Sequence, residues 1–339
     1  MRVFITGGAG FIGSNFIRYW MRQHPESAVT NFDKLTYAGN PENLREVAAQ
    51  PNYRFVQGDI CRTDQVLAAL EAETDLLINF AAESHVDRSI QDSTDFIRTN
   101  VVGVQVLLDV ARRRGVRRFV QISTDEVMGS LESGGYFTEE SPLQPNSPYA
   151  ASKAGGEMLV RAAQQTFGLD TIIIRSGNCY GPYQFPEKLI PLMIGNALED
   201  LPLPVYGDGL QVRDWVYVED YCRAADLIMK GGRAGDVYCI GARSEKTNLE
   251  VVEALLRSLN KPRSLIQFVE DRPGHDRRYA IDPAKVEREF GWRPEATFDT
   301  GIAKTVVWYQ ANSDWVEAVR SGAYRDYYQR MYGNRKILK

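Results

Sequence analysis

Three consecutive residues that could bind or transfer protons follow a short apolar run. Thr124, Asp125 and Glu126 follow residues 119–122 (FVQI) after one intervening serine, and this run has the composition of a buried strand. The ordinary explanation for adjacent charged residues in such a place is an exposed turn. In a buried site, however, close carboxylates separate their pKa values, so that one holds a proton while the other is ionised. The triplet therefore indicates either a solvated turn or an acid–base pair.

A tyrosine and a lysine four residues apart form a second pair that could do chemistry. Tyr149 and Lys153 lie in the stretch PYAASK, and residues i and i+4 share one face of a helix. A neighbouring ammonium lowers the pKa of a phenol from about 10, because it stabilises the phenolate. Such a tyrosine can accept the proton of an alcohol whose hydride leaves for a nicotinamide. Taken alone, the spacing is common, and it gains meaning only beside a dinucleotide site.

A glycine-rich turn near the start of the chain is typical of dinucleotide binding. Gly7, Gly8, Gly10 and Gly13 follow a predicted strand at 2–6 and satisfy both GxxGxxG and GxGxxG. Such glycines allow a tight turn, a close approach of backbone N–H groups to a pyrophosphate, and close packing of the next helix. The N-terminus of that helix favours the phosphates. Chance glycines in a flexible loop are the alternative, but the flanking strand and helix support the site.

The acid at the end of the second predicted strand indicates which dinucleotide would bind. Asp33 stands twenty residues after Gly13, where a carboxylate accepts both ribose hydroxyls of adenosine and repels a 2′-phosphate. This favours NAD over NADP, although the cation Lys34 works against that preference. Asp59, after the third strand, stands where an adenine edge could be read, or where a structural cap could form.

The elements that must position these residues alternate along the first half of the chain. Strands are predicted at 2–6, 28–32, 53–57, 76–80, 119–122 and 171–175. Helices are predicted at 16–22, 63–71, 96–115, 149–168, 218–230, 248–259 and 283–290. The strands are apolar throughout, as in strands covered on both faces, and their alternation with helices predicts a parallel, doubly wound sheet. Glycine, proline and aromatic residues become frequent after residue 176, which indicates a loop-rich region where a ligand could be gripped.

Composition excludes several classes of function. With 40 basic against 44 acidic residues, the chain has no basic excess for binding nucleic acid. Its four cysteines and three histidines show no metal-ligand spacing, so no metal is expected. No apolar run approaches the roughly 20 residues that span a bilayer, and the opening MRVFITGG is no secretory signal. Unpaired thiols fit a reducing cytosol, so a cytoplasmic protein is expected.

Taken together, the motifs resemble one branch of a known family. Besides GGAGFIG, TDE and YAASK, the chain contains DKLTYAGN, AAESHVDRSI, YGPYQFPEKLIPL, RDWVYVED and DRPGHDRRYAID. Over essentially its whole length it resembles the dTDP-glucose 4,6-dehydratase branch of the extended short-chain dehydrogenase/reductase family. The resemblance implies an α/β fold, with a Rossmann-type NAD-binding domain at 1–175 and a smaller C-terminal α/β domain for the nucleotide sugar at 176–339. Segments near 211–240 are expected to return to the first domain.

The resemblance also implies a role for each of the five candidate catalytic residues. Tyr149, supported by Lys153, would deprotonate the C4 hydroxyl of dTDP-glucose while NAD takes the C4 hydride, and Thr124 would orient the C4 oxygen. Glu126 would remove the C5 proton and Asp125 would protonate the departing C6 hydroxyl. The hydride would then return to C6, which yields a 4-keto-6-deoxy sugar. Because consecutive strand residues point to opposite faces, both acids can serve one sugar only if the strand has ended by Asp125.

The binding residues follow from the same resemblance. NAD contacts are expected at Gly7, Gly10, Phe11, Ile12, Gly13, Asp33, Lys34, Leu35, Thr36, Asp59, Ile60, Phe80, Ala81, Ala82, Ser84, Thr99, Tyr149, Lys153 and Cys179. Substrate contacts are expected at Ser84, Thr124, Asn178, Glu187, Lys188, Leu189, Pro204, Val205, Tyr206, Arg213, Asn248, Asp271, Arg272 and His275. Guanidinium groups such as those of Arg213 and Arg272 match phosphate geometry. Structural alternatives are an Arg213–Asp214 ion pair and a loop role for His275, and His85 is expected to be structural.

Three residues depart from the usual pattern of this branch. Met128 stands where STDEVYG has a tyrosine, and Gly177 and Cys179 replace residues of RCSNNYGP. Met128 can fill the space of a phenol but cannot replace its hydrogen bond. These changes remove no catalytic group, but they could loosen the cofactor or alter the sugar that is accepted.

Other functions stay open on the sequence. A UDP-sugar 4-epimerase or decarboxylase of the same family is disfavoured by Asp125 and Glu126, because epimerisation requires no elimination. A non-catalytic NAD-sensing protein would have no need of all five catalytic candidates. The choice between dTDP and UDP depends on one methyl group, and the pathway, rhamnose or antibiotic deoxysugar, is not visible. A homodimer through the helices at 96–115 and 149–168 is the family expectation.

Overall fold

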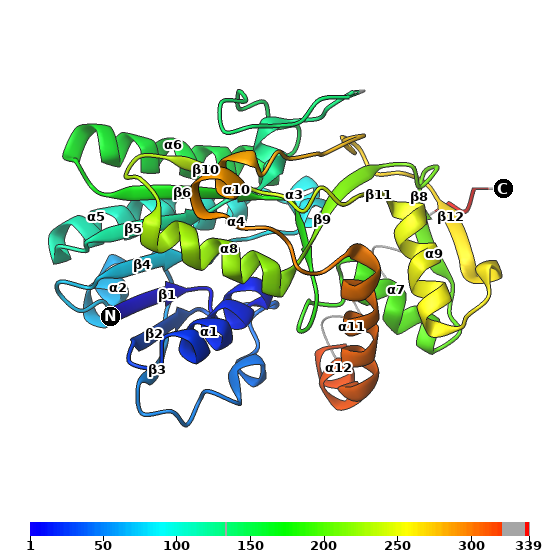
Figure 1. Ribbon diagram of the computed structural model, residues 1–339, viewed down its shortest axis with the longest axis horizontal. Helices are drawn as coiled ribbons and strands as arrows, with labels where there is room; N and C mark the ends of the chain where they lie inside the picture. The colour runs from blue at the N-terminus through cyan, green and yellow to red at the C-terminus, as the bar shows by residue number, and fades with distance from the viewer. Residues whose placement is uncertain (133, 321–335, 339) are drawn as a thin grey trace.

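Seven parallel strands form the central sheet of the computed structural model, which describes residues 1–132, 134–320 and 336–338 (Figure 1). In spatial order they are β3 (Tyr53–Gln57), β2 (Ala28–Asp33), β1 (Arg2–Thr6), β4 (Leu76–Asn79), β5 (Arg118–Ile122), β6 (Thr171–Ser176) and β10 (Val237–Ile240). The strand order reverses between β1 and β4, and such sheets bind ligands beyond the carboxyl ends of their strands at this point. The predicted α/β fold with a doubly wound parallel sheet is confirmed.

Helices cover both faces of this sheet. They are α1 (Phe11–Gln23) and α8 (Val218–Gly231) on one face, and α2 (Thr63–Ala69), α5 (Val104–Arg114) and α6 (Pro148–Phe167) on the other. Trp20 and Ile228 are fully buried on the first face, and Leu107 and Val160 on the second. Burial of each such side chain contributes about 1.5–3 kcal/mol. These two apolar layers hold the sheet, and with it the ends of the strands, in place.

A second group of elements lies at the right of Figure 1. Its strands are β7 (Asn178–Tyr180), β8 (Leu203–Tyr206), β9 (Val212–Tyr217), β11 (Glu245–Thr247) and β12 (Ile266–Val269), paired as β11-β9-β7 and β12-β8. Its helices are α7 (Leu189–Leu198), α9 (Asn248–Leu259), α11 (Phe298–Ala311) and α12 (Ser313–Val319). They enclose a core of their own that includes Ile194, Leu255 and Ile302. The region predicted as loop-rich after residue 176 therefore contains more regular structure than its composition indicates.

Short elements complete the described chain. They are η1 (Pro41–Leu44), α3 (Val86–Gln91), α4 (Thr94–Ile97), η2 (Arg98–Gly103), η3 (Asp125–Met128), η4 (Arg263–Leu265) and α10 (Ala284–Phe290). Among the helices of the described residues, none has the length and apolar character needed to cross a membrane.

One predicted helix is confirmed with an irregularity, and the burial expected of one predicted strand is wrong. The helix expected at 96–115 runs through α4, the π-helical turn η2 and α5. Such turns are frequent at functional sites, and this one carries Thr99. The strand at 53–57, expected to be buried, is exposed or half-buried along its length, because β3 is an edge strand with a neighbour on one side only.

Parts of the second half of the chain return to the first sheet. β10 pairs with β6 in parallel, and Ile240 belongs to the same apolar cluster as Trp20. The chain therefore crosses between the two groups of elements more than once. The division at residue 175 itself stays a prediction.

Candidate active site

Two adjoining cavities lie where the strands of the central sheet end. The first, about 300 Å³, is lined by the glycine turn and by residues that follow β2, β3, β4, β5 and β6. The second, about 180 Å³, is lined by residues of α3, α7, β8, β9 and α9 and of the segment 272–279. Both cavities are lined by Glu126, Asn178, Glu187 and Lys188. These four residues mark the junction between the two spaces.

The cavities bring together nearly all of the predicted site residues. The first is lined by every predicted NAD contact except Leu35, and by Thr124, Asp125 and Glu126. The predicted substrate contacts line one or both cavities, except Asp271. Leu35 adopts a positive φ of 58° and its N–H donates to Asp33 Oδ1 at 2.8 Å. Asp271 lies behind the second cavity, with its Oδ1 atom 2.6 Å from Nδ1 of His275.

The glycine turn has the close packing that its motif predicts. Gly7 has a φ of +69°, and a Cβ atom there would lie 2.4 Å from the backbone nitrogen of Ala81. A Cβ at Gly13 would lie 2.3 Å from the carbonyl oxygen of Gly7. Larger residues are therefore excluded where α1 begins beside the cavity. The open space in front of this helix N-terminus fits a dinucleotide pyrophosphate.

The structure resolves the competition between Asp33 and Lys34. Lys34 Nζ lies 2.9 Å from Asp59 Oδ2, so its charge is paired with that carboxylate. Asp33 accepts the backbone N–H groups of Ala9 (2.9 Å) and Leu35 (2.8 Å), and burial raises its pKa. Because a carboxylate can accept about four hydrogen bonds, Asp33 retains acceptors toward the cavity. The Asp33 carboxylate would repel the 2′-phosphate of NADP, which agrees with NAD as the cofactor.

A single helical turn places both acids of the triplet in the site. β5 ends at Ile122, and Thr124 caps η3, in which Asp125 and Glu126 are the first two residues. Thr124 Oγ1 accepts the N–H of Glu126 at 3.3 Å and donates to Asp125 Oδ1 at 3.1 Å. The condition that the strand has ended before Asp125 is therefore met. Both carboxylates line the first cavity.

The two acids have opposite electrostatic surroundings. Burial, followed by the charge of Glu126, raises the pKa of Asp125 to about 8. Burial also raises the pKa of Glu126, but the cations Arg272, Arg213 and Lys188 oppose this shift. Burial and the charge of Glu126 thus favour a proton on Asp125 at neutral pH, while the three cations favour the ionised form of Glu126. The solvated turn, the ordinary explanation for the triplet, is wrong for this site.

Tyr149 and Lys153 share one face of α6, but their direct coupling differs from the prediction. Lys153 Nζ donates to the carbonyl oxygen of Ile122 at 2.6 Å, and burial lowers its pKa to about 8. Burial, followed by the charge of Glu126, raises the pKa of Tyr149, whereas a hydrogen bond with Thr124 lowers it. The expected lowering of the phenol pKa by Lys153 is therefore wrong. The reason is that the ammonium binds a strand-end carbonyl and the phenol is buried.

Buried cations surround the junction and the second cavity. Arg213 donates to the carbonyl oxygens of Val212 (2.7 Å) and Asp276 (3.0 Å) and stacks on the ring of Tyr279. It does not pair with Asp214, whose carboxylate accepts backbone N–H groups instead, so that structural alternative is wrong. Lys188 Nζ donates to the carbonyl oxygen of Ser84 at 2.8 Å. These cations make the second cavity attractive to a diphosphate.

Sequence reasoning missed an acid in the second cavity. Asp87 accepts hydrogen bonds from Arg272 Nη1 (3.2 Å) and the Tyr206 hydroxyl (3.0 Å), although it is only 6% exposed. His85, expected to be structural, lines the same cavity, and burial lowers its pKa to about 3. Both lie in the block AAESHVDRSI, whose polar residues next to a strand end were the available signal.

The three departures from the family pattern have different surroundings. Met128 is 2% exposed and packs with Val127, Phe137 and Tyr279 in an apolar cluster, and it lines neither cavity. Gly177 and Cys179 line the first cavity. A Cβ at Gly177 would lie 2.8 Å from the carbonyl oxygen of Asp214, and burial raises the pKa of Cys179 to about 12. Met128 is thus a packing residue, and Cys179 a protonated thiol at the cavity wall.

The described residues contain no cluster of three histidine, cysteine or acidic side chains that could hold a metal ion. The sheet, the glycine turn and the buried acid pair beside Tyr149 define a dinucleotide-dependent enzyme of the short-chain dehydrogenase/reductase class. Residues 4–305 match the model of the family described as GDP-mannose 4,6 dehydratase. The chain belongs to this family.

Individual relatives are similar over nearly their whole length. A dTDP-glucose 4,6-dehydratase of an Actinoplanes species is 50% identical, over 93% of this chain and 99% of the relative. A protein of the same name from Salmonella typhimurium is 47% identical, over 99% of this chain and 100% of the relative. The crystal structure of DesIV, a dTDP-glucose 4,6-dehydratase from Streptomyces venezuelae with NAD bound, has a TM-score of 0.92 and 51% identity, covering 94% of this chain and 100% of that one.

Proposed function

We propose that the chain is a dTDP-glucose 4,6-dehydratase, an NAD-dependent hydro-lyase that forms dTDP-4-keto-6-deoxyglucose and water. The observation that carries this proposal is the placement of Asp125 and Glu126 by one turn of η3 in the first cavity, which Tyr149 also lines, with Glu126 at the junction to the second. Epimerisation at C4 needs a base and a hydride acceptor, but it includes no elimination and so does not need the pair of acids Asp125 and Glu126. The relatives that carry the dehydratase name are about 50% identical over nearly the whole chain.

Each catalytic side chain has a defined proton to hold or move. Tyr149 Oη accepts the proton of the C4 hydroxyl in its phenolate form, which the hydrogen bond with Thr124 favours, and Thr124 Oγ1 orients the C4 oxygen. The residues of the first cavity would hold NAD, which would supply the hydride acceptor for C4 and the hydride donor for C6. The new ketone acidifies C5, from which Glu126 removes the proton and to which it later returns it. The water that leaves C6 takes its proton from Asp125, and solvent carries the proton from Tyr149 back to that carboxyl.

The protonation states of the two acids agree with these roles. A general acid must hold its proton at neutral pH, and the pKa of Asp125 is raised to about 8. Its Oδ2 atom is buried and has no hydrogen-bond partner among the described residues, so it is available to a substrate hydroxyl. Glu126 lies among Lys188, Arg213 and Arg272, whose charges favour the ionised base.

The residues of the first cavity fit NAD. The turn at Gly7 and Gly13 would receive the pyrophosphate, and Asp33 would bind the adenosine ribose. Lys153 would bind and orient the nicotinamide half, beside Tyr149. Three solved relatives with 46–51% identity contain NAD, which supports the same cofactor here.

The residues of the second cavity fit the nucleotide end of the substrate. Arg213 and Arg272 would neutralise the diphosphate, and Lys188 lies at the junction, where the sugar would join it. Tyr206 packs edge-on against His275, with ring centroids 6.2 Å apart, and could form a wall for the pyrimidine. These assignments rest on position and residue type.

The decisive experiment is turnover of dTDP-glucose and UDP-glucose side by side. A dehydratase forms a 4-keto-6-deoxy sugar nucleotide, which chromatography and mass spectrometry identify by the loss of water. Formation of dTDP-galactose without loss of water would refute the proposal in favour of an epimerase. NAD binding without turnover of either nucleotide would support the non-catalytic NAD-sensing protein.

The exposed apolar residues of two helices support a homodimer as part of this proposal. Val102 of η2 and Met158 of α6 are 49% and 46% exposed, and η2 packs against α6. Such a patch marks an interaction surface, and a twofold axis would bury it against its copy. Val102→Glu together with Met158→Glu should give a monomer in light scattering. A dimer that persists in this variant would place the interface elsewhere.

A further inference from the structure

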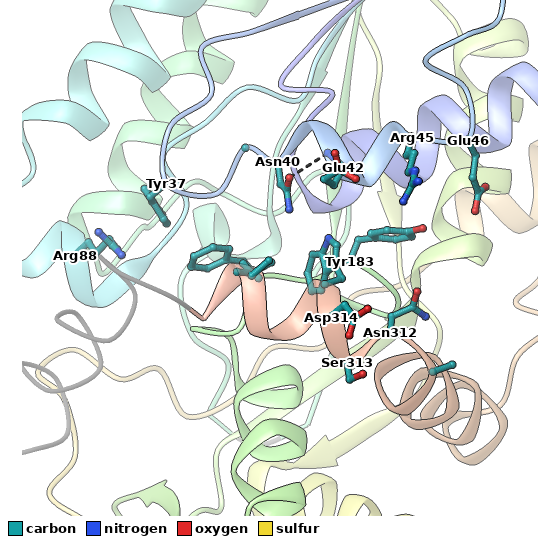
Figure 2. A pocket seen from close by; sticks show the side chains of 16 residues that line it. Tyr37, Asn40, Glu42, Arg45, Glu46, Arg88, Tyr183, Asn312, Ser313 and Asp314 are labelled. Carbon is teal, nitrogen blue, oxygen red and sulfur yellow. Dashed lines mark hydrogen bonds between the residues drawn. The ribbon is translucent and has the colours of Figure 1, made fainter.

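A third cavity lies directly outside the proposed cofactor site. It has a volume of about 790 Å³ and lies between the loop that follows β2, η1 and the helix α12 (Figure 2). Gly39 and Phe185 line both this outer cavity and the cofactor cavity. Tyr37 and Arg88 line the outer cavity and Glu187 lines the cofactor cavity, so these side chains lie between the two spaces. These side chains decide whether a bound dinucleotide is open toward the outer cavity.

The partition consists of four side chains from three segments. The Arg88 guanidinium of α3 lies 3.9 Å from the centre of the Tyr37 ring, and its Nε and Nη2 atoms donate to Glu187 Oε2 at 3.1 and 3.0 Å. The Tyr37 hydroxyl donates to the same Glu187 carboxylate. The Tyr37 ring packs edge-on against Phe185 at 5.6 Å. Every member thus contacts at least one other, and the two loops are tied together through Arg88.

Burial and charge favour the closed arrangement. The Glu187 side chain is 2% exposed and that of Arg88 is 27% exposed. Burial raises the pKa of Tyr37 far above its usual value, so its hydroxyl stays a donor at neutral pH. A buried carboxylate that loses a partner carries a large desolvation penalty. Opening the partition by moving either loop alone would leave Glu187 with fewer partners, so the closed state is the stable one.

We propose that Tyr37, Arg88 and Glu187 form a latch that retains NAD in its cavity through successive turnovers, and that the outer cavity is the route by which the cofactor leaves. The latch joins the loop that follows Asp33 to the loop that carries Lys188. It rests on the proposed function, in which the hydride returns to the substrate and NAD is regenerated in every cycle. A cofactor that is regenerated in place needs no exchange, and a closed partition suits this chemistry.

The test measures cofactor retention without any sugar nucleotide. Arg88→Met, Tyr37→Ala and the milder Tyr37→Phe are purified, and the NAD released by acid is quantified per protein chain. The dissociation rate is measured by exchange with fluorescent etheno-NAD. A partly buried cation–π contact and charge-assisted hydrogen bonds are each worth roughly a tenfold factor. We therefore expect at least about tenfold faster release in the first two variants and a smaller change in Tyr37→Phe.

A matched control is available beside the outer cavity. Arg18 also stacks 3.9 Å from a tyrosine ring, that of Tyr183, which lines the outer cavity at its other side (Figure 2). Arg18→Met removes the same kind of contact outside the partition and should retain NAD as the wild type does. Thermal unfolding with and without added NAD separates cofactor loss from misfolding, because added NAD restores the melting temperature of a folded variant.

Two outcomes would overturn the latch. One is stoichiometric NAD with a wild-type release rate in both Arg88→Met and Tyr37→Ala. The other is equally fast release from Arg18→Met, or from the wild type itself. A wild type that retains NAD but does not dehydrate dTDP-glucose would refute the proposed function and leave the latch intact, so the two failures are distinguishable.

Discussion

Replacing Asp125 with asparagine isolates the proton that the elimination step requires. Asparagine has the shape of a protonated aspartate, so it fills a position that is 2% exposed without leaving a cavity. It also keeps an acceptor for the Thr124 hydroxyl, which now donates to Asp125 Oδ1 at 3.1 Å. It cannot release a proton at neutral pH. Because Tyr149 and Lys153 are untouched, oxidation at C4 should continue while dehydration stops.

The size of the effect follows from the protonation state of Asp125. With a pKa of about 8, about nine in ten Asp125 carboxyls hold a proton at pH 7. The group is therefore almost entirely in the form that acts as an acid. One such group contributes ~100- to 10,000-fold to a rate. We expect product formation to fall by at least about 100-fold, while Glu126 keeps its three neighbouring cations and its strength as a base.

The assay is a single turnover followed in a rapid-mixing instrument. After mixing with dTDP-glucose, the absorbance of reduced nicotinamide should rise in Asp125→Asn and persist, because the hydride has no C6 acceptor. In the wild type the same signal should be transient or small. Quenched samples analysed by mass spectrometry should contain a keto sugar that has not lost water.

Two results would refute this reasoning. Dehydration at the wild-type rate would show that Asp125 is not the acid. Failure to reduce NAD, in a variant that still binds it, would place Asp125 in the oxidation half of the reaction. Glu139→Gln is the matched control, since burial also raises the pKa of Glu139 and this residue lines neither cavity. It should leave turnover unchanged.

Three further predictions concern catalysis, pH and stability. Tyr149→Phe should reduce turnover of dTDP-glucose by at least ~100-fold without formation of reduced nicotinamide, and accumulation of that signal would contradict its role as the base at C4. A carboxyl whose pKa is raised in the folded state stabilises the fold below its unfolded value, near 4, and loses that contribution as the pH rises to about 8. Between about pH 4 and pH 8, the free energy of unfolding of Asp125→Asn minus that of the wild type, both measured in urea, should therefore increase by up to ~1.4 kcal/mol per pH unit. A difference that does not change with pH would contradict the raised pKa. Arg175 donates to the fully buried Glu157 at 2.8 Å, so Arg175→Met should lower the free energy of unfolding by about 3–5 kcal/mol. Adding Glu157→Leu should recover most of this loss. An unchanged stability in Arg175→Met would contradict the importance of the pair.

Interior and edge strands of the central sheet differ in how far the sequence predicted them. Strands such as β1 and β5 were located within a residue, because short apolar runs between turn residues allow few alternatives. β3 has a similar composition, but its exposure was mispredicted, since whether a strand lies at an edge depends on spatial order. The helix predicted at 96–115 contains a π turn at Thr99, for which single-sequence periodicity has no signal.

The candidate site shows the same limit in its electrostatics. The residue types and motifs of Thr124, Asp125 and Glu126 predicted an acid pair, but not which acid would hold the proton. That depends on Arg213 and Arg272, which lie far along the chain and come near Glu126 only in the folded protein. Likewise, the sequence could not show whether Lys34 offsets the preference of Asp33 for NAD. In the structure, Lys34 pairs with Asp59.

By itself, the sequence determined the fold class, the dinucleotide turn and the identity of the reactive groups, because these depend on local patterns and on residue types at fixed spacings. Only the tertiary structure decided the protonation of Asp125, the binding of Lys153 to Ile122, and the contact of Tyr37 with Arg88 and Glu187. Each of these depends on burial and on charges brought together from distant segments. The physical reason is that desolvation and Coulomb interactions act through space between distant segments, whereas hydrophobic periodicity is a pattern among residues that are near one another in the sequence.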